Sequence, residues 1–133
     1  MKNIKQYYKE LGKMVYAVAA ADGMISAEEK ETLHHFVVKK LVNYEKAEDS
    51  SGMNEAFYVD FEFDDKATQH ADASSALKSF SKFVHENYEE GDEDLMRHSL
   101  EVLERVAATY TRTKETEIVS QVKSEIKEVY KEI

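Results

Sequence analysis

The stretch Ala19–Lys30, AAADGMISAEEK, decides the fold because it carries both a helix-ending and a helix-starting signal. Gly23 can adopt the left-handed conformation that commonly ends a helix. Ser26 and Glu29 have the spacing of a capping box, in which each side chain bonds to a backbone N–H at the start of a helix. Ile25 can pack back onto the helices that meet here. The stretch therefore predicts a compact joint between two helices.

The same residues look like the second half of a calcium-binding loop, which is an alternative interpretation. With Gly23 at loop position six and Glu29 at position twelve, an EF-hand needs oxygen ligands at positions one and three. Those positions hold Val18 and Ala20, which continue the apolar and small-residue pattern of the preceding helix. The calcium-loop hypothesis therefore fails on its ligands.

Asp22 is not required by a purely structural joint, because a negative side chain at a helix C-terminus opposes the helix dipole. Glu28 and Glu29 lie in the first turn of the next helix and could share a cation with Asp22. An Asp that bonds to nearby backbone groups, or a charge tolerated by solvent, explains the residue without a metal. The residues alone favour the structural explanation and leave a metal site open.

Composition and charge limit the classes of protein to which the chain can belong. Its 133 residues are 42% hydrophobic and 34% charged, which suits one globular domain with its own core. The sequence has no Cys, so disulfides, Cys-ligated metals and thiol catalysis are excluded. The formal net charge of −9 disfavours a nucleic-acid partner and favours cations or basic protein surfaces. No signal peptide or apolar run of about 18 residues is recognisable, so we expect a cytoplasmic protein without membrane insertion.

Hydrophobic periodicity predicts an all-α chain, and the absence of Pro removes the strongest helix breaker. Apolar residues recur at helical spacing in five segments, and the short joints between them favour a single-domain antiparallel bundle. These five main helices are expected over residues 3–21, 26–44, 73–88, 93 to about 110, and 113 to near the C-terminus.

Residues 46–71 interrupt this pattern and are expected to form an irregular insert within the single domain of residues 1–133. A loop-like stretch is followed by FYVDFEFDD, residues 57–65, whose apolar and polar residues alternate as in a strand. A lone strand has nothing to pair with, and one helical turn would fit the aromatic residues as well. We therefore expect an irregular or briefly helical segment that places four side chains against the bundle: Phe57, Val59, Phe61 and Phe63.

The run Val18–Glu29, VAAADGMISAEE, lies between two expected helices and resembles the signature of the tellurite-resistance TerB-like domains. That superfamily includes TerB and the N-terminal domain of some membrane-associated DnaJ-like co-chaperones. The resemblance implies an all-helical bundle with two related helix-turn-helix halves, each with an Asp-Gly joint followed by a Glu. It also implies divalent-metal binding by these acids and service as an interaction module in stress responses. Asp22 and Glu29 match the acids of the first half.

A second, degenerate copy of the motif lies at a constant offset, from Val106 to Glu117. Glu117 matches Glu29, but Tyr110 stands where a symmetric family member has Asp. A metal site built from both halves would therefore lack one carboxylate, and Tyr110 could instead hydrogen-bond to a carboxylate. The candidate metal ligands are then Asp22, Glu29, Glu28 and Glu117.

Other chemistry-bearing residues give weaker patterns. Glu31 and His34, with His35 beside them, have the i, i+3 spacing that can bind a metal on a helix. The sequence offers no matching pair elsewhere, so surface or core histidines are the favoured interpretation. No phosphate loop, nucleophile elbow or other catalytic frame is recognisable, and we expect no enzymatic activity.

Three functions agree with these patterns. The leading hypothesis is a non-catalytic TerB-like module that binds a protein partner in a bacterial stress response. The second is a divalent-cation binding or sensing domain that uses Asp22 and Glu29. The third is a structural bundle that homodimerises through its aromatic segment or its lysine stripes, which comprise Lys2, Lys5, Lys9 and Lys13, and Lys123, Lys127 and Lys131.

Overall fold

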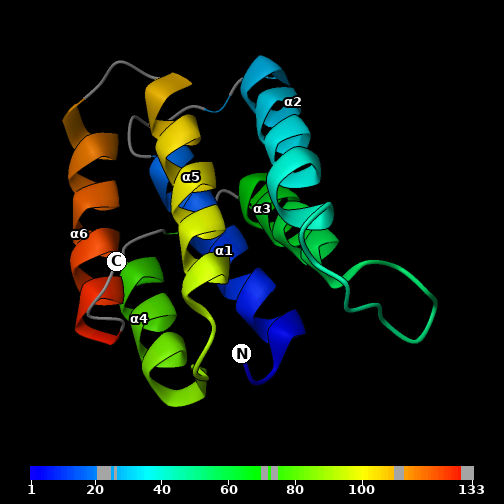
Figure 1. Cartoon of the computed structure of the whole chain (residues 1–133). Helices are drawn as coiled ribbons and strands as arrows, with labels where there is room; N and C mark the ends of the chain where they lie inside the picture. Colours follow the sequence, from blue (N-terminus) through cyan, green and yellow to red (C-terminus); the bar gives the residue numbers. More distant parts are fainter. Residues whose placement is uncertain (21–24, 26, 70–71, 73–74, 110–112, 130–133) are drawn as a thin grey trace.

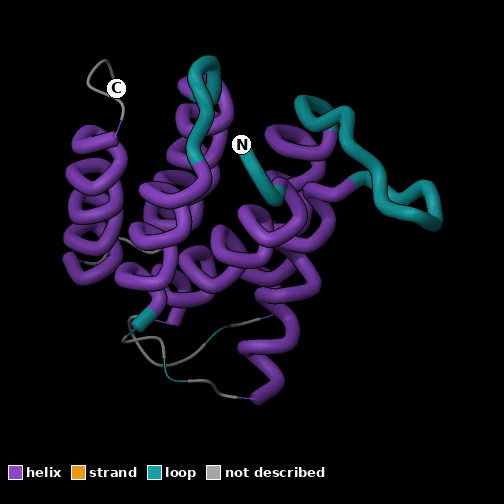
Figure 2. Tube along the Cα trace, turned by 90° about the horizontal axis from the view of Figure 1, so that it is seen from below, coloured by secondary structure: helices purple, strands orange, loops and turns teal. Residues whose placement is uncertain are grey.

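The computed structural model describes residues 1–20, 25, 27–69, 72, 75–109 and 113–129, without the side chains of residues 29, 109, 113–118, 125 and 129. Within these ranges every regular element is a helix, as Figure 2 shows, and the β-type pairing is limited to an isolated bridge between Glu48 and Asn54. The protein is therefore an all-α bundle, which confirms the predicted fold class.

The described ranges contain six α-helices and two short helices of other types. In chain order they are α1 (Ile4–Ala19), α2 (Ala27–Phe36), the π-helix η2 (Val37–Val42), the 3-10 helix η3 (Glu55–Phe57), α3 (Tyr58–Gln69), α4 (Ala76–Asn87), α5 (Glu93–Thr109) and α6 (Thr113–Val129). Figure 1 shows that α4, α5 and α6 run in alternating directions. The five helices expected from periodicity correspond to α1, to α2 continued by η2, and to α4, α5 and α6.

α1 is the central helix of the bundle. Eleven of its sixteen residues are buried, and it contacts α3, α4, α5 and α6. In Figure 1 it lies behind α5. A helix covered on several sides must be apolar around most of its circumference, and the apolar residues of α1 extend beyond one stripe. Six of its apolar residues are completely buried: Tyr7, Tyr8, Leu11, Met14, Val15 and Val18.

The irregular insert expected over residues 46–71 is wrong for its second half, because residues 58–69 form α3. Val59 and Phe63 are four residues apart and buried, whereas Phe61 is 50% exposed. The expected plug of four apolar side chains is therefore wrong at Phe61. A helix satisfies its own backbone hydrogen bonds, whereas a lone strand cannot, and packing of α3 against α1 selects the helical period.

Residues 43–54, which include the first part of the expected insert, project from the bundle as a loop (Figure 1). Oδ1 of Asp49 accepts hydrogen bonds from the backbone and hydroxyl of Ser51 and from the backbone of Met53. These bonds, led by that of the Ser51 hydroxyl, lower the pKa of Asp49 to about 2. The side-chain amide of Asn54 closes the loop by donating to the carbonyls of Val42 and Glu45. The segment is therefore irregular but specifically bonded.

Candidate functional site

Three of the four metal ligands proposed from the sequence fall on parts of the chain that the structure does not describe. Asp22 lies outside the described residues, and so do the side chains of Glu29 and Glu117. Glu28 is described and is exposed in the first turn of α2. Where side chains are described, no three of His, Asp or Glu lie close enough together to hold a metal ion. Metal binding at the joint therefore stays a prediction.

A groove between α2 and α3 is the candidate functional site. It is lined by residues 30–36 and Val38 on one side and by Asp60, Phe63 and Asp64 on the other. Its volume is about 880 Å³, compared with about 480 Å³ for a hollow beside Met1 and about 160 Å³ for one between α1 and α4. A concave, largely apolar site with a few polar groups is the usual form of a binding site.

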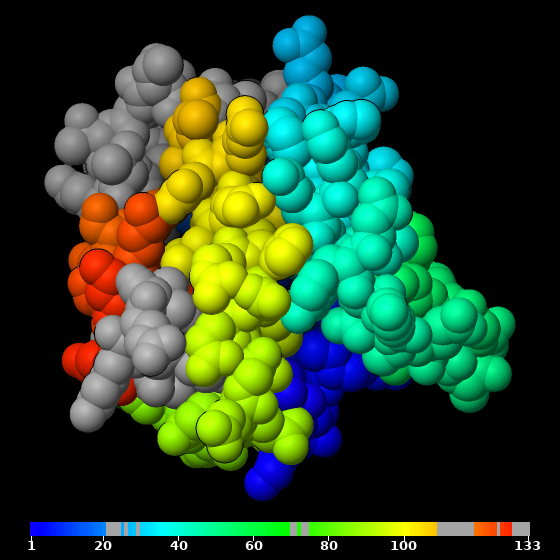
Figure 3. Space-filling view, viewed as in Figure 1, coloured from blue at the N-terminus to red at the C-terminus, as the bar shows by residue number. Residues whose placement is uncertain are grey.

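The packing of the helices explains why this groove exists. α2 packs against α5, whereas α3 packs against α1, so the facing sides of α2 and α3 are held apart by their different supports. In the space-filling view, α2 lies in front of α3, of which a small area is visible at the right-hand side of the molecule (Figure 3). Leu33 and Phe63 form the buried floor of the groove, and Phe36 and Val38 are half-buried beside them.

The polar centre of the groove is a pair formed by His34 of α2 and Asp60 of α3. Nδ1 of His34 lies 2.5 Å from Oδ2 of Asp60. When Asp60 is ionised, its carboxylate can only accept, so the ring nitrogen is the donor. The His34 side chain is 62% exposed and that of Asp60 is 12% exposed. The imidazole therefore covers a carboxylate that lies deeper in the groove.

Asp60 occupies an unfavourable position for a charge. Burial raises the pKa of its carboxyl above the ordinary value of 3.8, while the hydrogen bond from His34 acts in the opposite direction. The charge of Asp64, one turn along α3, also raises the pKa of Asp60. An ionisable group with a raised pKa in a concave site is a physical indicator of function, because ordinary folding selects against it.

The raised pKa of Asp60 gives a prediction for stability. Because this pKa is higher in the folded chain than in the unfolded chain, protonation of Asp60 stabilises the fold. This stabilisation is complete below pH 3.8 and is lost as the pH rises through the folded-state pKa. Asp60→Asn is uncharged at every pH and keeps an oxygen that can accept from His34. We therefore expect Asp60→Asn to have a larger free energy of unfolding than the unaltered chain at pH 7, with a smaller difference at pH 4. Urea unfolding at both pH values measures this, and a less stable variant at pH 7 would show that the carboxylate supports the fold.

The sequence indicated half of this site and missed the other half. Glu31, His34 and His35 were recognised on the second helix, but no partner was found for them. Asp60 and Asp64 have the i, i+4 spacing that puts both on one helix face, next to the buried pair Val59 and Phe63. Interpreting residues 57–65 as a helix would have revealed that face. Its position opposite His34 depends on tertiary packing.

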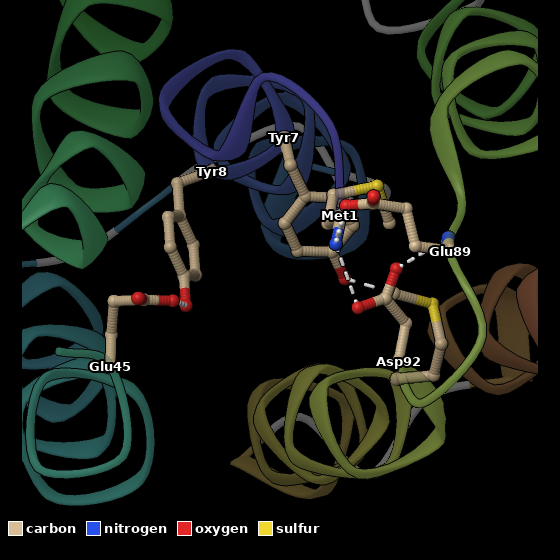
Figure 4. A network of polar contacts seen from close by, with 7 residues as sticks. Met1, Tyr7, Tyr8, Glu45, Glu89 and Asp92 are labelled. Carbon is tan, nitrogen blue, oxygen red and sulfur yellow. Dashed lines mark hydrogen bonds and ion pairs between the residues drawn. The ribbon is translucent and has the colours of Figure 1, made fainter. Parts of the chain in front are cut away.

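Two tyrosines of α1 make a second set of polar contacts, away from the groove (Figure 4). The Tyr8 hydroxyl donates to Oε1 of Glu45 at 2.5 Å, and the Tyr7 hydroxyl lies 2.5 Å from that of Ser99. Burial raises the pKa of Tyr8, and the bond to Glu45 raises it further. Tyr8 is therefore a neutral hydrogen-bond donor at physiological pH, and its contact joins α1 to the start of the projecting loop.

The N-terminal ammonium group also contributes to the contacts in Figure 4. It lies 2.9 Å from a carboxylate oxygen of Glu89 and 2.8 Å from one of Asp92, in the connection between α4 and α5. Burial lowers the pKa of this ammonium, but its hydrogen bonds to Asp92 and Glu89 produce a net rise. These contacts hold the start of α1 against the connection between α4 and α5. The hollow beside Met1 is smaller than the groove between α2 and α3.

Comparison of the chain with models of known protein families, with curated proteins and with solved structures finds no match. The TerB-like resemblance of the first joint therefore stays a prediction. In the described part of the chain, no helix has the length and apolar character that a membrane crossing requires. Function has to be inferred from the groove itself.

Proposed function

We propose that this chain is a non-catalytic interaction module that binds a helical segment of a protein partner in the α2–α3 groove. The observation that carries the proposal is the groove's composition. An apolar floor formed by Leu33 and Phe63 lies beside a polar pair, His34 and Asp60. The resemblance of the run Val18–Glu29 to TerB-like domains adds an expected setting, a bacterial stress response in which such modules bind partners.

A helix is the occupant that suits the groove's shape. The two walls are themselves helices that lie apart, so a third helix can pack against both, as amphipathic helices do in helix-in-groove recognition. Apolar residues of the occupant would cover the half-buried Phe36 and Val38, and the charged rim would fix its orientation. The gain in buried apolar area supplies the affinity.

Binding is better supported than catalysis at this site. A His–Asp pair can act as base and orienting group, but the nucleophile that such a pair activates is a hydroxyl or thiol within hydrogen-bond reach of the base. Of the described residues that line the groove, Thr32 supplies the sole hydroxyl, and no bond joins it to His34. The pair is therefore assigned to recognition.

The proposal is tested with a panel of amphipathic helical peptides of about 15 residues, the length at which isolated helices become marginally stable. We expect some of them to cause saturable NMR shift changes at the backbone amides of Leu33 and Phe63. Val38→Asp places a charge in the groove and should abolish these changes. Val42→Asp is the matched control, because Val42 is also half-buried but lies outside the groove. Changes confined to other surfaces, or equal binding by both variants, would contradict the proposal.

A further inference from the structure

Asp60 is a buried carboxylate without the partner that such groups usually have. Buried acids are normally paired with Arg or Lys, or neutralised, because an isolated charge is costly to remove from water. Among the described side chains, no Arg or Lys forms an ion pair with Asp60. The side chain that donates a hydrogen bond to its carboxylate is that of His34. The described part of the chain therefore provides no Arg or Lys partner for the Asp60 carboxylate.

His34 covers Asp60 but does not enclose it. The ring stands on the exposed side of α2, and more than half of its side-chain surface is open to solvent. Rotation of the ring away from the groove therefore requires no repacking of the core. It exposes the Asp60 carboxylate to any ligand that enters from the groove.

The charges around Asp60 favour a cation. The described lining carries three carboxylates, on Glu31, Asp60 and Asp64, against one lysine, Lys30. The formal charge of the whole chain is −9, which attracts basic ligands over a longer range. Among the residues that the structure describes, no third metal-binding side chain joins His34 and Asp60, so these residues are a poor match for a metal ion. A cation on an aliphatic stem suits the site better, because the stem can lie along the apolar floor.

We propose that the occupant of the groove is a partner helix that presents an arginine or lysine, whose cation displaces the His34 ring and pairs with Asp60 and Asp64. This inference rests on the proposed function of the groove and specifies the chemistry of its ligand. The occupant's apolar residues cover Leu33 and Phe63, while its basic side chain forms charge-assisted hydrogen bonds with the carboxylates. His34 acts as a replaceable partner that keeps Asp60 hydrogen-bonded while the groove is empty.

The test uses two small probes of similar size and shape, the cationic n-butylguanidinium and the neutral n-butylurea. Each is titrated into the protein, and binding is followed by the NMR shifts of the Asp60 carboxyl carbon and the His34 ring. We expect n-butylguanidinium to bind at least about tenfold more tightly, the ratio expected for a hydrogen bond to a charged group. Asp60→Asn should remove this preference, and Asp64→Asn should reduce it.

His34→Ala gives the sharpest outcome, because it removes the side chain that competes with the ligand. It should strengthen binding of n-butylguanidinium several-fold and leave n-butylurea unchanged. His35→Ala is the matched control, because His35 lines the same groove but does not bond to Asp60. Weaker binding in His34→Ala would overturn the displacement step. Equal binding of both probes, or a preference that persists in Asp60→Asn, would overturn the cation site.

These probes separate the inference from the function on which it rests. If helical peptides bind the groove but n-butylguanidinium shows no preference, the ligand chemistry is wrong and the interaction module stands. If no helical peptide binds, the proposed function itself is wrong. Sedimentation measures whether the chain self-associates. Self-association that is abolished by Asp60→Asn would identify the occupant as a second copy of the chain and would overturn the proposal of a separate protein partner.

Discussion

Replacement of Gly12 by a large side chain should strongly destabilise the fold. A Cβ atom at this position of α1 would lie 2.7 Å from the carbonyl oxygen of Val59 and 2.8 Å from Cβ of Glu62, both in α3. A backbone oxygen cannot rotate aside, so the two helices would have to separate. Overpacking of this kind costs about 1–3 kcal/mol, while replacing a helical Gly by Ala gains about 1 kcal/mol.

We therefore expect a net loss in the free energy of unfolding of about 1 kcal/mol for Gly12→Ala and about 3 kcal/mol for Gly12→Leu, measured by urea unfolding. The matched control is Gly91, where nothing lies within 4 Å of an added Cβ but the backbone φ is +98°. There Ala and Leu should cost the same, because the loss comes from the backbone conformation alone. If Gly12→Ala were more stable than the unaltered chain, α1 and α3 could not be so closely packed.

Tyr8→Phe should give the second large effect, through loss of one hydrogen bond. Tyr8 is completely buried, and its hydroxyl donates to Oε1 of Glu45. Oε2 of Glu45 accepts from the backbone N–H groups of Lys46 and Ala47. A hydrogen bond to a charged group contributes about 1.5–3 kcal/mol, so we expect a loss of about 2 kcal/mol in the free energy of unfolding.

The adjacent Tyr7→Phe variant is the control for Tyr8→Phe. Tyr7 is equally buried, but its hydroxyl contacts two uncharged groups, the hydroxyl of Ser99 and the sulfur of Met96. The Ser99 hydroxyl also donates to the carbonyl oxygen of Leu95. Loss of the neutral contacts of the Tyr7 hydroxyl should therefore cost only about 1 kcal/mol. Hydrogen exchange provides a second measurement, since Tyr8→Phe should speed exchange in the loop after Glu45 and Tyr7→Phe should not. Equal losses in the two variants would mean that the charge of Glu45 is not what makes the Tyr8 contact strong.

Local signals made most of the bundle predictable. Gly91 and Asp92 mark the start of α5, which the structure places at Glu93. The expected start of the last helix at Thr113 is likewise the start of α6. These helices could be predicted because the signals for each lie within one contiguous segment. The signals are apolar residues with a period of 3.6 and polar residues at the helix ends.

α3 shows where local signals are insufficient. Apolar residues in FYVDFEFDD stand at every second position, which gives the period of a strand. The helix forms because it packs against α1, where Gly12 allows the backbone of Val59 to approach closely and the ring of Tyr16 meets that of Phe63. The role of Gly12 could not be predicted from local signals either, because the residues that it contacts, Val59 and Glu62, are about 47 to 50 positions away in the chain.

The sequence by itself determined the helical class, the positions of five helices and the acidic character of the chain, because these depend on the spacing of residues along one segment. Tertiary structure alone decided that α1 is central, that Gly12 sets the distance to α3, and that His34 meets Asp60 across a groove. The physical reason is that a helix fixes which residues share a face, while packing with other helices fixes what that face meets. His34 and Asp60 are 26 residues apart, and only the placement of α2 and α3 makes them one site.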